Sequence, residues 1–284
     1  MIPDAAATTG PAPERDIFDR VFTGREDGPT LAAAVTDCTV VMVRGLFGAW
    51  IPGHFRAPLA RLRSAGWQAT IARTDPAGTI EHNRRLLVRQ VAALVDAGRR
   101  PLFLAHSKGG LEILLALAGE PRLAQATLAC VGVQVPRAGA PCLESMFHGR
   151  HRDSLRRGDR LREPAEAALL TLAGARSACR ELDGPVIAPL AALLDRSGLP
   201  FRCLMVASCA RQPSLSLELR FGRLDRIEPG QPHDGVFFTR DQCWPGHAML
   251  QLDGIDHSQP SIGGLGFAHD RFWPALLQAV LASR

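Results

Sequence analysis

Ser107 lies in a short segment whose residue types favour a nucleophile. Leu104–Gly110 reads LAHSKGG, so an apolar stretch leads directly to a serine, and a helix-forming stretch, LEILLALA, begins at once. A serine at such a strand–turn–helix corner has a strained backbone, which requires small residues two positions before it and two after it. Ala105 and Gly109 occupy these positions. The pattern predicts a nucleophilic serine; the alternative is an incidental serine at a buried turn.

The same segment resembles the nucleophile turn of the lipase-like branch of the α/β-hydrolases. Ala105 stands where the G-x-S-x-G pattern has glycine, as in the A-x-S-x-G form of some small bacterial lipases. The resemblance extends over about residues 38–284 in the order of the parts. It implies an α/β-hydrolase fold, with a mostly parallel central sheet and helices on both faces, and hydrolysis of acyl esters through Ser107.

The resemblance also indicates a base and an acid, which follow the serine along the chain in that family. His257, in GIDHSQP, comes after the last candidate strand and before the C-terminal helix, where the family's catalytic histidine lies. Asp234, in HDGVF, is similar to the family's D-G-(apolar) segment and is preferred as the acid, with Asp225 and Asp241 as alternatives. Asp256 adjoins His257, so the two side chains diverge, and we expect a turn or cap role for it.

A serine that attacks an ester also needs two preorganised N–H donors for the oxyanion of the tetrahedral intermediate. The resemblance places one on the backbone of Lys108, directly after the serine. It places the other on Leu46 in VRGLFGAW, which is similar to the H-G-(apolar)-x-G oxyanion segment of lipases, with Arg44 in place of the histidine. A glycine-rich turn without catalytic duty is the alternative for this segment. The side chain of Lys108, the only lysine, could face substrate or solvent.

These candidates follow apolar segments that are typical of buried strands. Six such segments occur, at 38–44, 67–72, 101–106, 128–135, 201–207 and 247–252. Helical stretches lie at 54–65, 80–97, 108–118 and 268–283. Strands that alternate with helices predict a parallel sheet covered on both faces. Runs such as VVMV and LFLA are apolar at successive positions, as strands buried on both faces require.

The alternation stops between residues 142 and 200, where AEAALLTLA and APLAALL indicate helices. We therefore predict a helical cap over 142–200, inserted into a core formed by 15–141 and 201–284. The apolar faces of its helices could line an acyl pocket; the alternative is that they form a further layer against the sheet. Residues 1–14 lack periodicity and are predicted to be a mobile leader.

Composition and motifs restrict the remaining possibilities. The formal charge is +5, and six arginines fall between Arg150 and Arg162 without interleaved aromatic residues, which favours a solvated helix face over a nucleic-acid site. Seven cysteines without CxxC spacing predict reduced, mostly buried thiols. Neither a signal peptide nor a bilayer-length apolar run is evident, so a cytoplasmic protein without an integral membrane segment is expected. His148 and His151, in HGRH, are predicted to be a surface pair, and no cofactor or metal is implied.

These features lead to one primary function and two alternatives. The primary prediction is a carboxylic ester hydrolase that acts on a small-molecule acyl ester, with Ser107, His257 and Asp234 as the triad. A thioesterase, polyester depolymerase or acyltransferase would use the same residues with another leaving group or acceptor. A non-catalytic α/β-hydrolase-fold protein that binds a ligand or partner is the alternative from another class.

Overall fold

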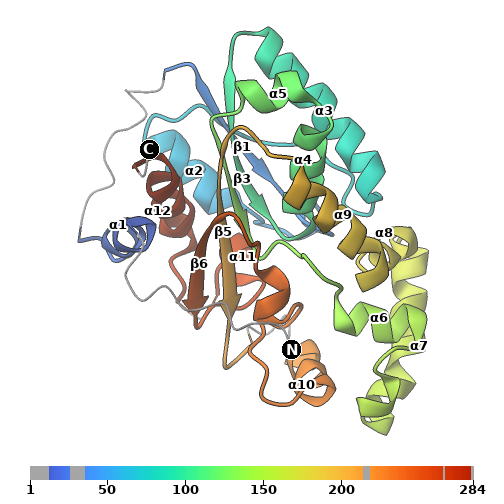
Figure 1. The fold of residues 1–284 in the computed structure, drawn as a ribbon. Coiled ribbons are helices and arrows are strands. Elements are labelled where there is room, and N and C mark those ends of the chain that lie inside the picture. Colours follow the sequence, from blue (N-terminus) through green and yellow to red (C-terminus); the bar gives the residue numbers. More distant parts are fainter. Residues whose placement is uncertain (1–12, 26–35, 214–217, 265, 283–284) are drawn as a thin grey trace.

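A computed structural model describes residues 13–25, 36–213, 218–264 and 266–282 (Figure 1). In these residues six parallel strands form one sheet in the order β2-β1-β3-β4-β5-β6. The strands are β1 Cys38–Val43, β2 Ala69–Ile71, β3 Arg100–His106, β4 Ala129–Val133, β5 Arg202–Cys209 and β6 Ala248–Asp253. Each overlaps one of the six predicted segments, so the predicted parallel sheet is confirmed.

Helices cover both faces of this sheet (Figure 1). On one face lie α1 (Pro13–Phe22), α2 (Arg56–Ser64) and α12 (His269–Ala282), and on the other α3 (Ile80–Asp96), α4 (Lys108–Ala118), α5 (Pro121–Ala126) and α9 (Gly184–Arg196). The remaining helices are α6 (Pro141–His148), α7 (Arg157–Leu172), α8 (Arg176–Arg180), α10 (Glu218–Ile227) and α11 (Gln259–Ile262), with 3-10 turns η2 (Arg152–Ser154) and η3 (Thr239–Gln242). Among the described helices, none is long and apolar enough to span a membrane.

Strand β1 shows why consecutive apolar residues are needed in the sheet. All six of its residues are buried. Val40 and Met42 pack in the hydrophobic cluster that contains α12, whereas Val41 and Val43 pack in the cluster that contains α3 and α4. Successive side chains of a strand point to opposite faces, so a sheet with helices on both sides buries every position.

The N-terminal helix α1 overlaps the end of the segment predicted as a mobile leader. Residues 1–12 of the 1–14 segment lie outside the described residues. Pro13 and Glu14 are the first residues of α1, and Glu14 is buried and forms an ion pair with Arg202 of β5. The helix therefore begins within the range assigned to the leader.

The segment between β4 and β5 contains helices α6 to α9, in the region predicted as a cap. Helix α9 packs beside α4, with Ile187, Ala191 and Leu194 buried in the same hydrophobic cluster as α4. Helix α7 lies farther out, at the lower right of Figure 1. Part of this segment therefore thickens the helical layer on one face of the sheet.

Helix α7 turns its charged side inward and its apolar side outward. The Glu166 carboxylate accepts hydrogen bonds of 2.7 and 2.8 Å from the guanidinium of Arg223 in α10, which is almost fully buried. Leu161, Leu169 and Leu172 are 71%, 66% and 84% exposed. Within the apolar run ALLTLA, Leu170 packs against the core, whereas Leu169 and Leu172 face away from it, and α7 adds ionic contacts on its inner side.

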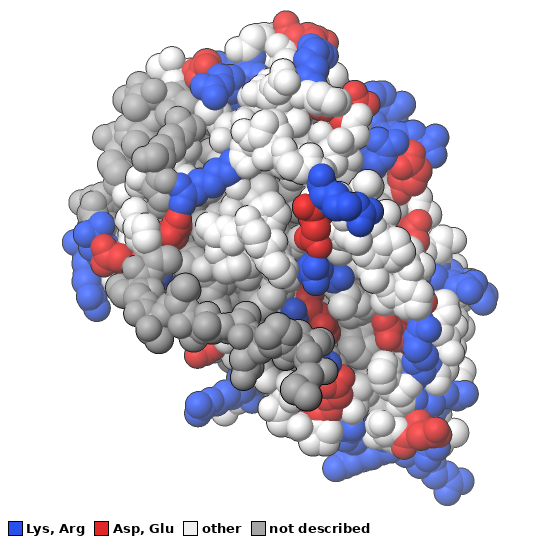
Figure 2. All heavy atoms as spheres, in the orientation of Figure 1, with Lys and Arg blue, Asp and Glu red and all other residues white. Residues whose placement is uncertain are grey.

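The arginines between Arg150 and Arg162 lie among acidic side chains. Arg150 forms an ion pair with Asp183, and Arg152 lies 3.6 Å from Glu163. Figure 2 shows blue and red side chains interspersed over the part of the surface where α7 lies. This arrangement agrees with the predicted solvated helix face.

Most of the cysteines are buried, whereas the two histidines of HGRH lie at the surface. Five of the seven cysteines are buried, and within the described residues none forms a disulfide. His148 lies 3.7 Å from Asp183, and His151 lies 3.2 Å from Glu144; both imidazoles are partly exposed. The two histidines therefore contact separate carboxylates at the surface.

Burial predicts a sharp contrast between two leucines. Leu87 of α3 is fully buried in the core, whereas Leu172 of α7 is 84% exposed. We expect Leu87→Ala to lower the free energy of unfolding by about 2–5 kcal/mol, because it leaves a cavity. The matched control Leu172→Ala should change it by less than about 0.5 kcal/mol. Urea denaturation followed by circular dichroism measures both, and equal losses would contradict the packing described here.

Candidate active site

The backbone of Ser107 has a conformation that is rare outside glycine. Ser107 follows β3 and precedes α4, with φ 55° and ψ −136°. Its N–H donates to the carbonyl of Val133 at 2.9 Å, and its own carbonyl accepts from Gly110 N at 2.9 Å. A residue held in such a region costs about 1–3 kcal/mol and persists only where its surroundings impose it. The turn predicted from LAHSKGG is present, with the serine at its apex.

Two glycines allow β1 and α4 to approach each other at this turn. A Cβ atom on Gly109 would lie 2.3 Å from the carbonyl oxygen of Arg44, in the loop after β1. A Cβ atom on Gly45 would lie 2.8 Å from Cβ of Ser107. Neither distance is sterically allowed, so both positions require glycine. The demand for Gly109 thus comes from the neighbouring loop as well as from the serine's own backbone.

His257 contacts both of the other predicted triad residues. Its Nε2 lies 3.0 Å from Oγ of Ser107, and its Nδ1 lies 2.7 Å from Oδ2 of Asp234. Its backbone N–H also donates to the Asp234 carbonyl at 2.8 Å. In the sequence His257 lies 23 positions after Asp234 and 150 positions after Ser107, and the fold brings the three side chains together. This arrangement can pass a proton from the hydroxyl to the imidazole.

The carboxylate of Asp234 is fixed by its own loop. Asp234 is fully buried, and its Oδ1 accepts hydrogen bonds of 2.8 Å from the backbone N–H groups of Val236 and Phe237. The other oxygen, Oδ2, remains for the imidazole. An acceptor at Nδ1 favours the tautomer that carries its proton there and leaves Nε2 free to accept the hydroxyl proton.

The two rival aspartates have other partners. Asp225 lies 3.1 Å from His233 Nε2, and its side chain is 65% exposed. Asp241 lies 3.6 Å from Arg240, and burial raises the pKa of its carboxyl to about 6. Of the three aspartates, only Asp234 has a hydrogen bond to the imidazole of His257.

Asp256 serves the turn that carries His257. Its Oδ1 accepts hydrogen bonds of 2.9 Å from the N–H groups of Ser258 and Gln259, at the start of α11. The expected turn or cap role is therefore confirmed.

The two predicted oxyanion donors lie beside Ser107. Lys108 is the first residue of α4, and Leu46 follows Gly45, where a Cβ atom would lie 2.8 Å from Cβ of Ser107. Within the described residues, no carbonyl accepts a backbone hydrogen bond from Leu46 or Lys108. Neither N–H group thus has a backbone acceptor there, and the positive end of the α4 dipole lies at Lys108.

The side chain of Lys108 adopts neither of the two positions considered from the sequence. It is 1% exposed and forms an ion pair with Glu112, which is equally buried. Burial raises the pKa of the Glu112 carboxyl to about 7, while the ammonium of Lys108 opposes this shift. The only lysine is thus enclosed in the protein.

Two further histidines surround His257 and were not singled out from the sequence. The ring centroid of His106 lies 4.7 Å from that of His257, and His54 lies next to His106 at 6.0 Å. Burial lowers the pKa of His106 well below its ordinary value and that of His54 to about 3. Both rings are therefore neutral near pH 7. A lone histidine next to a serine, or in an unremarkable loop, carries no local signal of such a position.

A cavity of about 290 Å³ opens at Ser107. Its wall is mostly apolar, and the lining side chains include Leu46, Phe47, Ile51, Leu143, Leu182, Val236, Phe237 and Ile262. Leu143 comes from α6 and Leu182 from the turn after α8. The segment predicted as a cap thus contributes to the cavity, but through residues other than ALLTLA and PLAALL.

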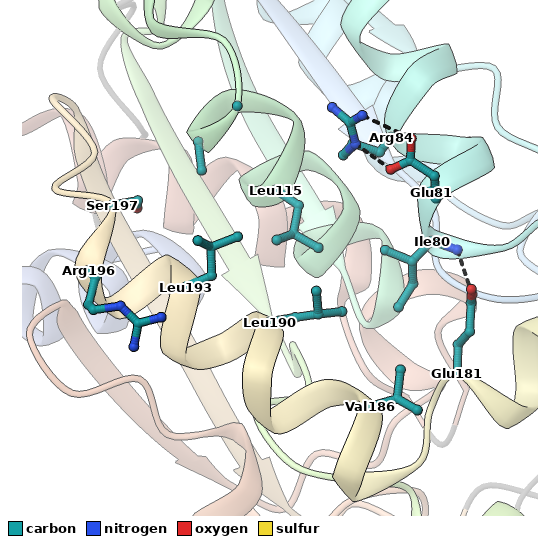
Figure 3. A pocket seen from close by; sticks show the side chains of 12 residues that line it. Ile80, Glu81, Arg84, Leu115, Glu181, Val186, Leu190, Leu193, Arg196 and Ser197 are labelled. Carbon is teal, nitrogen blue, oxygen red and sulfur yellow. Dashed lines mark hydrogen bonds and ion pairs between the residues drawn. The ribbon is translucent and has the colours of Figure 1, made fainter.

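A second, larger cavity of about 630 Å³ lies between α3, α4 and α9 (Figure 3). Leu190 and Leu193, from PLAALL, point into it together with Ile80 and Leu115. Ser107, Asp234 and His257 are not among the described residues that line it. The apolar face of PLAALL therefore borders this space and not the one at the serine.

Part of the chain is similar in sequence to a known esterase. No family model matches the chain. Esterase PIR7B from Oryza sativa subsp. japonica is 35% identical over 123 residues, which are 37% of this chain and 44% of that protein. The match thus spans less than half the length of that relative.

Solved structures match over a larger part of the chain. The metagenomic carboxyl esterase MGS0156 has a TM-score of 0.65 at 22% identity, covering 87% of this chain and 75% of its own. The mature lipase BlEst2 of Bacillus licheniformis has a TM-score of 0.64 at 17% identity, covering 84% of this chain and 91% of its own. The chain has the α/β-hydrolase fold and resembles esterases and lipases.

The close approach at Gly109 predicts a steric effect of a single methyl group. We expect Gly109→Ala to lower the free energy of unfolding by about 1–3 kcal/mol or more, because its Cβ would overlap the Arg44 carbonyl. The control is Gly158→Ala in α7, where a Cβ meets open space. That change should stabilise the protein by about 0.5–1 kcal/mol through helix propensity. Thermal and urea unfolding distinguish the two, and a neutral Gly109→Ala would refute the proposed need for glycine.

Proposed function

We propose that this α/β-hydrolase cleaves small carboxylic acyl esters through an acyl-enzyme intermediate on Ser107. The observation that carries the proposal is the unbroken line of hydrogen bonds from Ser107 Oγ to His257 Nε2 and from His257 Nδ1 to Asp234 Oδ2, at 3.0 and 2.7 Å. This line ends at the wall of an apolar cavity, where an ester carbonyl could reach the hydroxyl. The partial resemblance to esterases and lipases supports the same class of reaction.

The first half of the reaction acylates the serine. The Ser107 oxygen attacks the ester carbonyl while His257 Nε2 takes its proton, and Asp234 stabilises the resulting imidazolium. The carbonyl oxygen becomes an oxyanion, which accepts hydrogen bonds from the backbone N–H groups of Leu46 and Lys108. When the intermediate collapses, the carbon–oxygen bond to the alcohol breaks, and the imidazolium returns its proton to the leaving oxygen.

The second half of the reaction releases the carboxylic acid product and uses the same catalytic groups. Water gives a proton to His257 and attacks the acyl carbon, so a second oxyanion forms at the same donors. Its collapse breaks the bond to Ser107, which recovers its proton from the imidazolium. Each step therefore uses one base that alternates between its two protonation states.

The neutral histidines beside the site favour this cycle. Burial keeps His54 and His106 uncharged near neutral pH. A positive charge at either ring would oppose the imidazolium that forms on His257, because like charges at a few ångströms disfavour each other in a buried site. Because both rings are neutral, neither repels the imidazolium on His257, which the Asp234 carboxylate stabilises.

The cavity at the serine favours a small substrate. Its volume of about 290 Å³ is at the low end for pockets that bind small molecules. Its apolar lining suits a short alkyl or aromatic group, and its position beside His257 suits an ester bond at the entrance. We therefore expect short acyl esters to be better substrates than long ones.

Other acyl transfers share the first half of this mechanism. A thioesterase, polyester depolymerase or acyltransferase differs in the leaving group or in the acceptor that resolves the acyl-enzyme. Product analysis with p-nitrophenyl esters, acyl-CoA and added alcohols separates these reactions. Hydrolysis of the simple ester in preference to the others would support the proposal.

Covalent labelling tests the role of the serine directly. We expect a fluorophosphonate probe to label the folded protein in a one-to-one ratio, because the activated hydroxyl displaces fluoride from phosphorus. Ser107→Ala should abolish the label without loss of fold. Intact-mass spectrometry measures the label on the wild-type protein and on the variant. A folded wild-type chain that takes up no label would favour the non-catalytic binding protein.

Substitution by the isosteric asparagine tests whether Asp234 is the acid of the triad. Asp234→Asn should lower kcat by about 10⁴-fold, because an amide no longer stabilises the imidazolium and can select the wrong tautomer. Asp225→Asn is the matched control, since that carboxylate contacts His233 instead. It should leave kcat within about twofold of wild type. Comparable losses in the two variants would remove the reason for assigning the acid to Asp234.

A further inference from the structure

The side chain of Lys108 leads away from the cavity that its neighbour Ser107 lines. Among the described residues around that cavity, Ser107 is present and Lys108 is not. The Lys108 Nζ donates to the carbonyl of Gly78 at 2.8 Å and forms an ion pair with Glu112, one turn along α4. Lys108 is the only lysine among the 33 basic residues of the chain, and the three donors of its ammonium serve both the Gly78 carbonyl and the Glu112 carboxylate.

Asn83 of α3 extends this contact to a turn. Its Nδ2 donates to Glu112 Oε1 at 2.9 Å and to the Asp75 carbonyl at 3.0 Å, while its Oδ1 accepts from Asp75 N at 2.9 Å. Asn83 and Glu112 are 3% and 1% exposed. The turn of residues 75–78 is therefore held to α4 by the ammonium at Gly78 and by the amide at Asp75.

The same turn also holds the loop of the other proposed donor. The backbone N–H of Phe47, directly after Leu46, donates to the Pro76 carbonyl at 2.8 Å. Gly78 makes the turn compact, because a Cβ there would lie 2.8 Å from Cβ of Asp75 and 3.0 Å from Oδ1 of Asn83. The turn thus accepts one hydrogen bond of 2.8 Å from the loop after β1 and one of 2.8 Å from the Lys108 side chain at the start of α4.

We propose that the Lys108 side chain, with Glu112 and Asn83, sets the separation of the two oxyanion donors through the turn of residues 75–78. Lys108 is then a positioning residue as well as the bearer of one donor N–H. The proposal rests on the proposed ester hydrolysis. Its physical reason is that donors stabilise an oxyanion only when both are held at hydrogen-bond distance from the place where the charge develops.

A need for stability alone does not explain this buried pair. Apolar residues of similar size can often replace a buried ion pair without loss of stability, because the desolvation cost of the two charges is avoided. The pair lies within α4, but each member also makes a hydrogen bond outside it, Lys108 to the Gly78 carbonyl and Glu112 to the Asn83 amide. Such bonds have a direction that apolar contacts lack. The two explanations differ in what the paired replacement should do to turnover.

The main test is the charge-neutral double variant Lys108→Met/Glu112→Leu. We expect it to fold, since no buried charge is left unpaired, and to lose roughly 10- to 100-fold in kcat with little change in KM. A boronic acid that bonds to Ser107 forms a tetrahedral anion at the oxyanion site, so its affinity should fall by a similar factor. The affinity for the product alcohol, which makes no oxyanion, should remain at the wild-type value.

A matched control and a second variant complete the experiment. Glu81→Leu/Arg84→Met removes an ion pair from exposed positions of α3 and should leave kcat and boronate affinity unchanged. Asn83→Ala keeps the Lys108 pair but removes the hydrogen bonds that hold the turn at Asp75, and it should lower kcat and boronate affinity together. Asn83→Ala tests the proposal if Lys108→Met/Glu112→Leu does not fold.

Two results would overturn the proposal. Folded Lys108→Met/Glu112→Leu or Asn83→Ala protein with wild-type kcat and boronate affinity would show that the network has a structural role only. A wild-type protein that neither hydrolyses esters nor takes up a fluorophosphonate would instead refute the proposed function, and the positioning role with it. The wild-type measurement therefore separates the two failures.

Discussion

The strained turn at Ser107 is the constraint on which the site depends. A serine with φ 55° is held there by the β3 strand before it and the α4 helix after it, both buried in the centre of the molecule. The strain, about 1–3 kcal/mol, is small beside the apolar burial of these two elements. Because Gly45 and Gly109 let the loop after β1 approach, the turn also brings the first donor loop beside the hydroxyl.

The parallel sheet supplies the other groups. Loops that leave the carboxyl ends of parallel strands meet at one edge, so segments after β1, β3, β5 and β6 converge there. Leu46, Ser107, Asp234 and His257 come from these four segments in chain order. Backbone N–H groups hold the Asp234 carboxylate in place. Burial keeps the imidazoles of His54 and His106 neutral by lowering their pKa.

Several parts of this arrangement could be predicted from local sequence. The central strands β1, β3 and β4 are buried at consecutive positions, because both faces of the sheet are covered. The helices between the strands begin and end near the predicted residues. LAHSKGG contains a strand end, a turn and a helix start within seven residues, so the Ser107 turn is encoded where it occurs. In these cases the determining contacts are between neighbours in the chain or follow from a single periodicity.

Other parts were decided by tertiary structure. The periodicity of ALLTLA and PLAALL reveals an apolar face but not its partner, and Leu172 is exposed while Leu190 borders a remote cavity. Three aspartates were compatible with His257, and only the folded loop places Asp234 against the imidazole. The sequence by itself determined the alternating elements and the serine turn, since these depend on local pattern. The tertiary structure decided which aspartate contacts His257, the buried position of Lys108 and the cavity walls, because each depends on contacts between segments far apart in the chain.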